Sequence, residues 1–290
     1  MELLKFLRSK AVISSTIDMK EKITVAMAHY NTPELLQLSI ALWSNQTVPC
    51  EIWILDTGSN KNIDTWNSET VKVINIPQRK PVRHVSEVIA NACQYAQDNC
   101  RTKYLMQTHI DVFPKSRYLL EYWMSLMSES PVVGYGMSDR SFTESVLKDL
   151  WKDIVGHSLT MVDIPVMRDK KIEWSLQKSI DKYSVVSNSI DSPIDWDTEV
   201  TFGLDLKLAG IVPYMVGRDK NFKLLSDRWH SHCRSYTTGK SYTKNYKDLL
   251  KGKYDLSLEL LQKEFEEEIT RLKQMLKDTW KVDINKYKPQ

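Results

Sequence analysis

The stretch YLMQTHIDVFP, residues 104–114, decides how the rest of the chain is interpreted. Its apolar beginning, Tyr104 to Met106, predicts a buried strand, and Asp111 follows where that strand would reach the surface. A carboxylate on such a rigid support suits a metal ion, because hard cations prefer oxygen ligands. The sequence therefore predicts a metal site at Asp111. The alternative is that Asp111 caps a loop or a helix start.

Two more apolar strands upstream end in polar residues. Residues 23–27 lead into His-Tyr-Asn at 29–31, and residues 51–55 lead into Asp-Thr-Gly-Ser at 56–59. In parallel sheets, ligands bind at the carboxyl ends of the strands. We therefore expect the three strand ends to form one site that takes a nucleotide and a metal.

Helical and strand patterns alternate along this part of the chain. The first helix is expected to start at Pro33, with Asn31 or Thr32 as its cap, and its apolar residues fall on two faces, which predicts packing between layers. Further elements are a helix over 85–97, strands over 71–76 and 132–136, and a helix over 200–209. This alternation predicts an α/β fold with a mostly parallel sheet flanked by helices. The signals weaken between Trp151 and Asp195, where the charged run 168–171 is interpreted as a solvated loop.

Composition narrows the class of protein. At 290 residues the chain suits one large domain, or one domain with an appendage, and its net charge of +3 argues neither for nor against nucleic acid. Its four cysteines form no CxxC pair, which favours reduced thiols in a cytosolic protein. No stretch reaches the roughly 18 apolar residues of a membrane span, and residues 1–22 do not resemble a signal peptide. We expect a cytoplasmic protein, in the host cytoplasm if it is viral.

Three segments are expected along the chain: an N-terminal extension over 1–21, the α/β domain over 22–233, and a C-terminal extension over 234–290. The C-terminal extension begins with basic residues interleaved with tyrosines and continues into an amphipathic helix. The apolar stripe of that helix is made of Leu258, Leu261, Phe265, Ile269, Leu272 and Leu276. Such a stripe indicates core packing or a contact between copies in a homo-oligomer.

Several short segments of the α/β domain carry a family resemblance. In chain order they are Ala28-His29-Tyr30-Asn31, Asn45-Gln46, Asp56-Thr57-Gly58-Ser59, Ile89-Ala90-Asn91, His109-Ile110-Asp111 and Asp197-Thr198-Glu199. With them, residues 22–232 resemble family-2 glycosyltransferases of the GT-A fold. No single segment is specific, but their order is. The resemblance implies transfer of a sugar from a nucleotide sugar, such as UDP-glucose, with inversion at the sugar carbon.

The resemblance also implies roles for individual residues. Donor binding is expected from His29, Tyr30, Asn31, Asp56, Arg83 and Asn91. Metal binding is expected from Asp111, His109 and a late histidine, His232 or His230, with His232 slightly preferred. The implied cofactor is a divalent metal, manganese rather than magnesium, because an imidazole is a less suitable ligand for a hard ion. The base is expected to be Asp197, with Glu199 as the alternative and Asp195 third; these acids could instead cap the following helix.

The chain departs from the family pattern at three positions. Thr57 stands where the family has a second aspartate, which puts the contacts to the nucleotide base in doubt. Ala90 replaces the family arginine, whose charge could come from Arg83 or Lys80. His109 replaces the first acid of the metal motif. These departures keep an inactive nucleotide-sugar-binding module open as a non-enzymatic alternative. A sugar-nucleotide pyrophosphorylase is disfavoured, because no glycine-rich loop follows the first strand.

The basic segment over 234–254 is the part of the sequence that indicates what the acceptor is. Lysines and arginines there could contact phosphates and tyrosines could stack on bases, which would suit DNA; a solvated loop is the simpler interpretation. The residues concerned are Arg234, Lys240, Lys244, Tyr246 and Lys247. The chain also resembles glycosyltransferase-like proteins of bacteriophages, which implies a hydroxymethylated pyrimidine in DNA as acceptor. The alternative is a saccharide or a lipid-linked glycan of the cell envelope.

Overall fold

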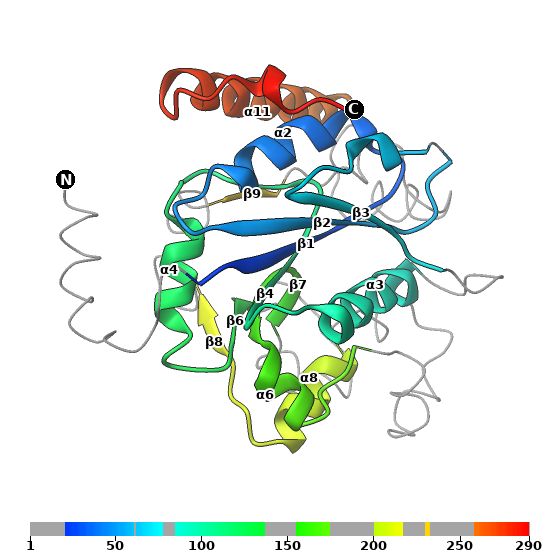
Figure 1. The fold of residues 1–290 in the computed structure, drawn as a ribbon, viewed down its shortest axis with the longest axis vertical. Helices are drawn as coiled ribbons and strands as arrows, with labels where there is room; N and C mark the ends of the chain where they lie inside the picture. Colours follow the sequence, from blue (N-terminus) through cyan, green and yellow to red (C-terminus); the bar gives the residue numbers. More distant parts are fainter. Residues whose placement is uncertain are drawn as a thin grey trace.

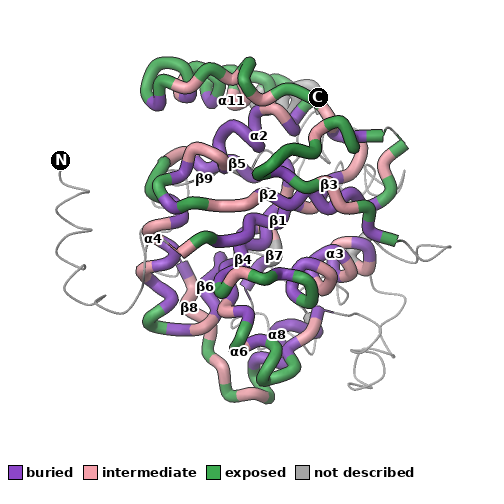
Figure 2. The backbone as a smooth tube through the Cα atoms, in the orientation of Figure 1, coloured by how far each residue is buried: buried purple, intermediate pink, exposed green. Residues whose placement is uncertain are grey.

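The computed structural model describes residues 21–60, 62–77, 85–136, 155–174, 200–216, 230–232 and 258–289. A mixed sheet forms the centre of the molecule, and helices cover both of its faces (Figure 1). On one face lie α2 (Pro33–Ser44), α4 (Leu119–Leu126) and α11 (Leu258–Asp278); on the other lie α3 (Val85–Asn99), α6 (Ile164–Asp169) and α8 (Val200–Leu208). Each face has its own cluster of buried apolar residues, and Figure 2 shows buried segments of the backbone on both sides of the sheet.

The main sheet has seven strands in the order β3-β2-β1-β4-β7-β6-β8. Its first four strands in this order are parallel to one another, β7 runs antiparallel to both of its neighbours, and β8 is parallel to β6. The strands are β1 (Ile23–His29), β2 (Cys50–Asp56), β3 (Val71–Asn75), β4 (Tyr104–His109), β6 (Val132–Gly136), β7 (Val155–Asp163) and β8 (Tyr214–Val216). The predicted α/β class, with a mostly parallel sheet flanked by helices, is confirmed.

Two strands form a separate small sheet. β5 (Val112–Pro114) pairs antiparallel with β9 (His230–His232), so that segments more than 100 residues apart in the chain lie side by side. The described residues also form two short 3-10 helices, η2 (Asp64–Trp66) and η5 (Ile284–Lys286). Within the described ranges, no helix is both long and apolar enough to cross a bilayer.

The first helix is packed between layers, as its two apolar faces predicted. The leucines of α2, together with Ile40 and Trp43, are buried, and α2 lies between the sheet and α11 (Figure 1). Thr32 occupies the N-cap position and Pro33 follows in the first turn, but the Thr32 side chain makes no capping hydrogen bond. The predicted position of the cap is therefore right, and the expected capping contact is not made.

The C-terminal helix packs onto its own chain. Leu272 and Leu276 are fully buried in the same apolar cluster as α2. Beyond the helix, Gln37 Nε2 donates to the carbonyl of Ile284 at 3.1 Å, and Asn45 Nδ2 donates to the hydroxyl of Tyr287 at 2.7 Å. Part of the predicted apolar stripe thus serves the core, and the homo-oligomer contact remains a prediction.

The strand β7 lies in a region where the sequence signals are weak. Polar residues interrupt its apolar pattern, yet they are accommodated because their groups are satisfied locally. Thr160 is fully buried and its hydroxyl donates to the carbonyl of Gly156 at 2.6 Å, while Thr108 of β4 donates to the carbonyl of Ser158 at 2.9 Å. β7 is nevertheless a central strand, because its backbone pairs with β4 on one side and with β6 on the other.

Residues 168–171 are exposed, as predicted, but the interpretation as a loop is wrong at Arg168 and Asp169, which lie in α6. The Nη2 of Arg168 donates to the carbonyls of Gln97, Asp98 and Cys100 at 2.8, 2.9 and 2.6 Å. The last carbonyls of a helix have no partner within the helix. Arg168 supplies that partner at the end of α3, and so joins two elements on the same face of the sheet.

Candidate functional site

The carboxyl ends of β1, β2 and β4 lie side by side. His29 is the register partner of Asp56 between β1 and β2, and Ala28 is the register partner of His109 between β1 and β4. The polar residues that follow the three strands are therefore brought to one edge of the sheet. This is the edge at which α/β proteins bind ligands.

Asp56 is held by hydrogen bonds from two neighbours. It is 5% exposed; its Oδ1 lies 2.9 Å from Nδ1 of His29 and accepts from the hydroxyl of Ser59. Its Oδ2 accepts from the backbone N–H of Ser59 at 3.2 Å. Burial opposes ionisation, but the hydrogen bonds from His29 and Ser59 outweigh it, and the pKa of Asp56 is lowered. The carboxylate therefore stays ionised at neutral pH.

The loops that follow β1 and β2 are joined to each other. Asn31, which has a left-handed backbone with φ of 50°, donates its N–H to the Ser59 hydroxyl at 2.8 Å and accepts from the N–H of Asn60 at 2.8 Å. Thr57 is buried, and both its N–H and its hydroxyl donate to the carbonyl of His29, at 3.0 and 2.8 Å. Thr57, at the position of the family's second acid, thus fixes the end of β1.

Asp111 lies in the turn between β4 and β5. It is 3% exposed, and its Oδ1 is 4.0 Å from Nδ1 of His109. The turn is held to β1 because the N–H of Ile110 donates to the carbonyl of Ala28 at 3.0 Å. No helix begins at Asp111, since α4 starts only at Leu119, so the alternative of a helix cap is excluded.

The small sheet brings a late histidine to this turn. His232 is the register partner of Val112, the residue after Asp111, whereas His230 is the register partner of Pro114. Their side chains lie outside the described part of the chain. Among the described residues no group of three or more His, Cys, Asp or Glu could hold a metal. The described donors are one carboxylate and one imidazole, both of which suit a divalent metal such as manganese.

Two further predicted donor-site residues lie within the described part of the chain. Tyr30 directly follows β1, and Asn91 lies half-buried on α3 next to Ala90, which is fully buried against the sheet. The other predicted site residues fall outside the described residues: Arg83, Asp195, Asp197, Glu199, Arg234, Lys240, Lys244, Tyr246 and Lys247. Sequence reasoning gave no role to Ser59; its place three residues after Asp56, across a glycine turn, was the available signal.

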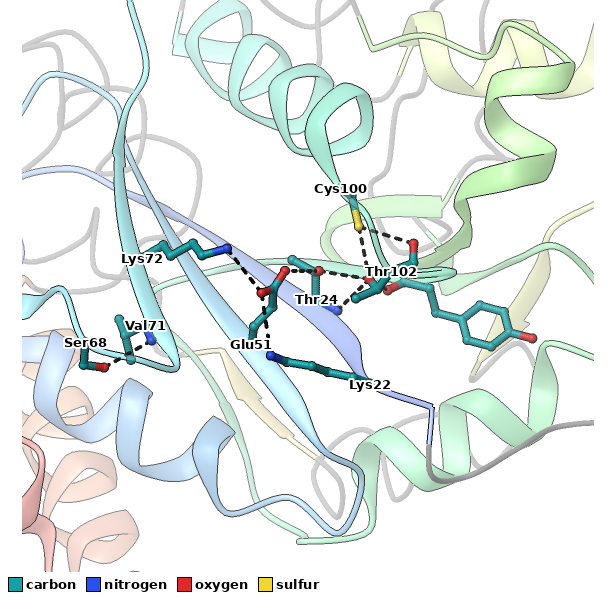
Figure 3. A network of polar contacts seen from close by, with 9 residues as sticks. Lys22, Thr24, Glu51, Ser68, Val71, Lys72, Cys100 and Thr102 are labelled. Atoms are coloured by element: carbon teal, nitrogen blue, oxygen red, sulfur yellow. Dashed lines mark hydrogen bonds and ion pairs between the residues drawn. The ribbon is translucent and has the colours of Figure 1, made fainter.

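The polar residues at the opposite end of the strands serve the fold. Figure 3 shows Glu51 of β2 between Lys22 and Lys72, with nitrogen–oxygen distances of 3.8 and 3.4 Å. Glu51 also accepts from the hydroxyl of Thr24 at 3.0 Å, and the N–H of Thr24 donates to the hydroxyl of Thr102 at 3.1 Å. These groups pair with one another across β1, β2 and β3, so this end of the sheet offers no comparable site among the residues that the structure describes.

Comparisons with known proteins give similarity at the level of structure. Neither a protein-family model nor a curated protein sequence matches the chain. A mannosyltransferase from Pyrobaculum calidifontis (PcManGT), solved in complex with GDP-Man and Mn²⁺, matches 73% of this chain and 61% of its own, at 13% identity and a TM-score of 0.45. TarS of S. aureus matches 70% of this chain and 38% of its own, at 12% identity and a TM-score of 0.41.

A third similar structure is the glycosyltransferase GlyE of Streptococcus pneumoniae TIGR4. It matches 83% of this chain and 53% of its own, at 9% identity and a TM-score of 0.44. The chain therefore spans less than two thirds of the length of these three proteins. At such identities and TM-scores the similarities carry no residue roles to this chain.

Proposed function

We propose that the chain is a glycosyltransferase of the GT-A type that moves a sugar from a nucleotide sugar, a UDP-sugar such as UDP-glucose, to an acceptor hydroxyl. The observation that carries the proposal is the register of β2, β1 and β4, because it places the polar ends of three strands at one edge. An ionised Asp56 lies at one end of this edge and Asp111 at the other. This arrangement suits a ligand with a nucleoside at one end and a diphosphate at the other.

The nucleoside is assigned to the β1 and β2 ends. Asp56 is acceptor-only when ionised, so it suits an N–H or O–H of a nucleoside. Tyr30 and Asn31 follow β1 at the same edge, and we assign them to the nucleoside as well. Asn91 and Arg83 are kept as donor contacts on the family resemblance alone.

The diphosphate and a divalent metal are assigned to Asp111. Asp111 and His109 would hold the metal, with His232 as the third ligand ahead of His230 because of its register. When bound, such a metal neutralises the charge of a departing nucleoside diphosphate. The donor atoms present are suitable for manganese, and the imidazole of His109 makes magnesium the less suitable ion.

The acceptor hydroxyl needs a base, which we assign to Asp197, with Glu199 as the alternative. Both residues precede the start of α8 at Val200. The base would take the hydroxyl proton as the oxygen attacks the sugar carbon and the diphosphate leaves. A single displacement of this kind inverts the configuration of that carbon.

For the acceptor we favour a hydroxymethylated pyrimidine in DNA, on the basic, tyrosine-containing segment that begins at Arg234. Such a base would have to be flipped out of the duplex or be otherwise accessible. A saccharide or lipid-linked glycan of the cell envelope is the second candidate. An inactive binding module would bind the donor with manganese and transfer sugar to none of them.

The test is manganese-dependent release of UDP from UDP-glucose, measured with DNA that contains 5-hydroxymethylpyrimidines and with unmodified DNA. We expect release with the modified DNA only, and none in Asp111→Ala. The matched control is Asp169→Ala, since the Asp169 side chain is 71% exposed on α6, and its activity should equal that of the wild type. Failure to bind any nucleotide sugar with manganese would overturn the proposed function, whereas donor binding with release only on a glycan would replace the acceptor.

A further inference from the structure

His29 is enclosed by the protein. Its side chain has no exposed surface, and its Nδ1 lies 2.9 Å from Oδ1 of Asp56, which lies across from it in the register of β1 and β2. Its Nε2 is also buried, and no described residue gives it a hydrogen bond. A side chain without exposed surface cannot itself touch a nucleotide. Any contribution of His29 to donor binding must pass through the residues that its Nδ1 contacts, chiefly Asp56 and, at 3.3 Å, the hydroxyl of Ser59.

The hydrogen bonds to Asp56 leave little of the carboxylate unused. An ionised carboxylate accepts about four hydrogen bonds and donates none. The imidazole of His29 and the hydroxyl of Ser59 both donate to Oδ1, and the N–H of Ser59 donates to Oδ2. Because the carboxylate only accepts, the proton of the shared bond is on Nδ1 of His29. With respect to the described residues, one lone pair remains on Oδ2, and its direction is set by the other three bonds.

We propose that His29 is a positioning residue, which fixes the rotamer of Asp56 so that the carboxylate presents one oxygen lone pair to a hydrogen-bond donor of the nucleoside. The inference rests on the proposed function and deepens it. The donor group is either an N–H of the base or a hydroxyl of the ribose. Uridine offers both, cytidine lacks the ring N–H, and a 2′-deoxynucleotide lacks one hydroxyl.

Burial makes this support necessary. Burial alone would raise the pKa of Asp56. The hydrogen bond from His29 is the largest of the contributions that lower this pKa. Without the imidazole, Ser59 would be the one partner left to the Asp56 carboxylate in the described part of the chain, and the carboxylate could rotate about its side-chain torsions. Ser59 lies in a loop after Gly58, whose φ is 98°, so a loop would then position the carboxylate in place of a strand residue.

The experiment compares two substitutions of His29 in the full chain. His29→Leu removes the donor, and His29→Asn retains an N–H near the position of Nδ1. Calorimetry would give the Kd for UDP with manganese, and turnover of UDP-glucose would give KM and kcat. We expect His29→Leu to raise Kd and KM about tenfold, which is the loss of one hydrogen bond to a charged group. His29→Asn should recover most of that loss, and kcat should change much less, because Asp56 contacts the nucleoside before and during transfer.

Ser59→Ala is the second variant, because it removes a hydrogen bond to the same oxygen from a partly exposed loop residue. It should also raise Kd, so the inference can be tested even if His29→Leu does not fold. Titrations with CDP and 2′-deoxy-UDP identify the donor group: weaker binding of CDP points to the base, and weaker binding of the deoxynucleotide points to the ribose.

Four outcomes overturn the inference. One is a wild-type Kd in His29→Leu. Another is an equal loss in His29→Leu and His29→Asn, which would make His29 a packing residue. If the wild type binds UDP and all variants bind it equally well, this inference alone is overturned. Wild-type protein that binds no nucleotide overturns the proposed function together with it.

Discussion

Val112 and His232 are register partners in the small sheet, which places the backbone of His232 directly across from the residue that follows Asp111. His230 pairs with Pro114 on the same strand. In an extended segment residues two apart point to the same side, so direction does not distinguish these histidines. Register does distinguish them. His232 pairs with Val112, the residue next to Asp111, whereas His230 pairs with Pro114, two residues further along β5.

We therefore predict that His232→Ala weakens Mn²⁺ binding more than His230→Ala. The expected loss is at least about tenfold for His232→Ala, since loss of a metal-site residue typically costs that much or more, and smaller for His230→Ala. Electron paramagnetic resonance of free Mn²⁺, titrated with protein in the presence of UDP, measures both. Asp111→Ala should lose the most. Equal losses in the two histidine variants, or the reverse order, would show that β9 does not supply the ligand by register.

The lowered pKa of Asp56 predicts a pH dependence of stability. A carboxyl whose pKa is lower in the folded chain stabilises the fold above the pKa of the unfolded chain, and this contribution is lost as the pH falls through the folded value. Asp56→Asn should therefore lower the free energy of unfolding at pH 7 by about 2 kcal/mol, the contribution of a hydrogen bond to a charged group. The difference from wild type should shrink below about pH 4.

Urea unfolding at a series of pH values measures this difference. Asp169→Asn is the control, because its exposed carboxyl should give a small and nearly constant difference. A difference for Asp56→Asn that stays the same from pH 7 to pH 3 would contradict the assigned hydrogen bonds to its ionised form.

Gly134 should not tolerate a larger residue. A Cβ at this position of β6 would lie 2.6 Å from Cβ of Val155 and 2.8 Å from Oγ1 of Thr160, both on β7. Gly134→Ala should lower the free energy of unfolding by about 1–3 kcal/mol, the usual cost of an overfilled core. Val155→Gly removes both Val155 atoms that the new Cβ would meet, so Gly134→Ala should cost less in the Val155→Gly background than in the wild type, and a double-mutant cycle from urea unfolding measures this coupling. Strictly additive effects would mean that the two strands do not touch at this point.

The sequence predicts the site edge better than it predicts the rest of the sheet. β1, β2 and β4 are continuous apolar runs that end in polar residues, so both the strands and their ends could be recognised. β7 could not, because Ser158 and Thr160 interrupt its apolar run, and only the fold supplies the carbonyl of Gly156 that accepts from the buried Thr160 hydroxyl. The hydrogen bonds of Arg168 to the end of α3 likewise depend on tertiary structure.

The partners within the site also needed the structure. The sequence names His29 and Asp56 as separate donor contacts, whereas the register of β1 and β2 makes them a buried pair. The structural reason to prefer His232 follows from the pairing of β5 with β9, which links distant segments and leaves no local signal. The assignment of Asp197 and Glu199 remains a prediction from the family resemblance.

The acceptor proposal predicts a salt-dependent interaction with DNA. Neutralising Lys244, Lys247 and Lys251 together should weaken binding of hydroxymethylated DNA. The slope of log K against log salt should fall by about 0.9 for each phosphate that the protein no longer neutralises. Fluorescence anisotropy at several salt concentrations measures both quantities.

The matched control neutralises Lys263, Lys273 and Lys277, three exposed lysines of α11, so that the change in net charge is the same. We expect this variant to bind DNA like the wild type, because α2 lies between α11 and the sheet (Figure 1). An equal loss in both variants would mean that DNA responds to overall charge alone. Unchanged binding in both would remove the support that the basic segment gives to a DNA acceptor, and would favour a saccharide or lipid-linked acceptor.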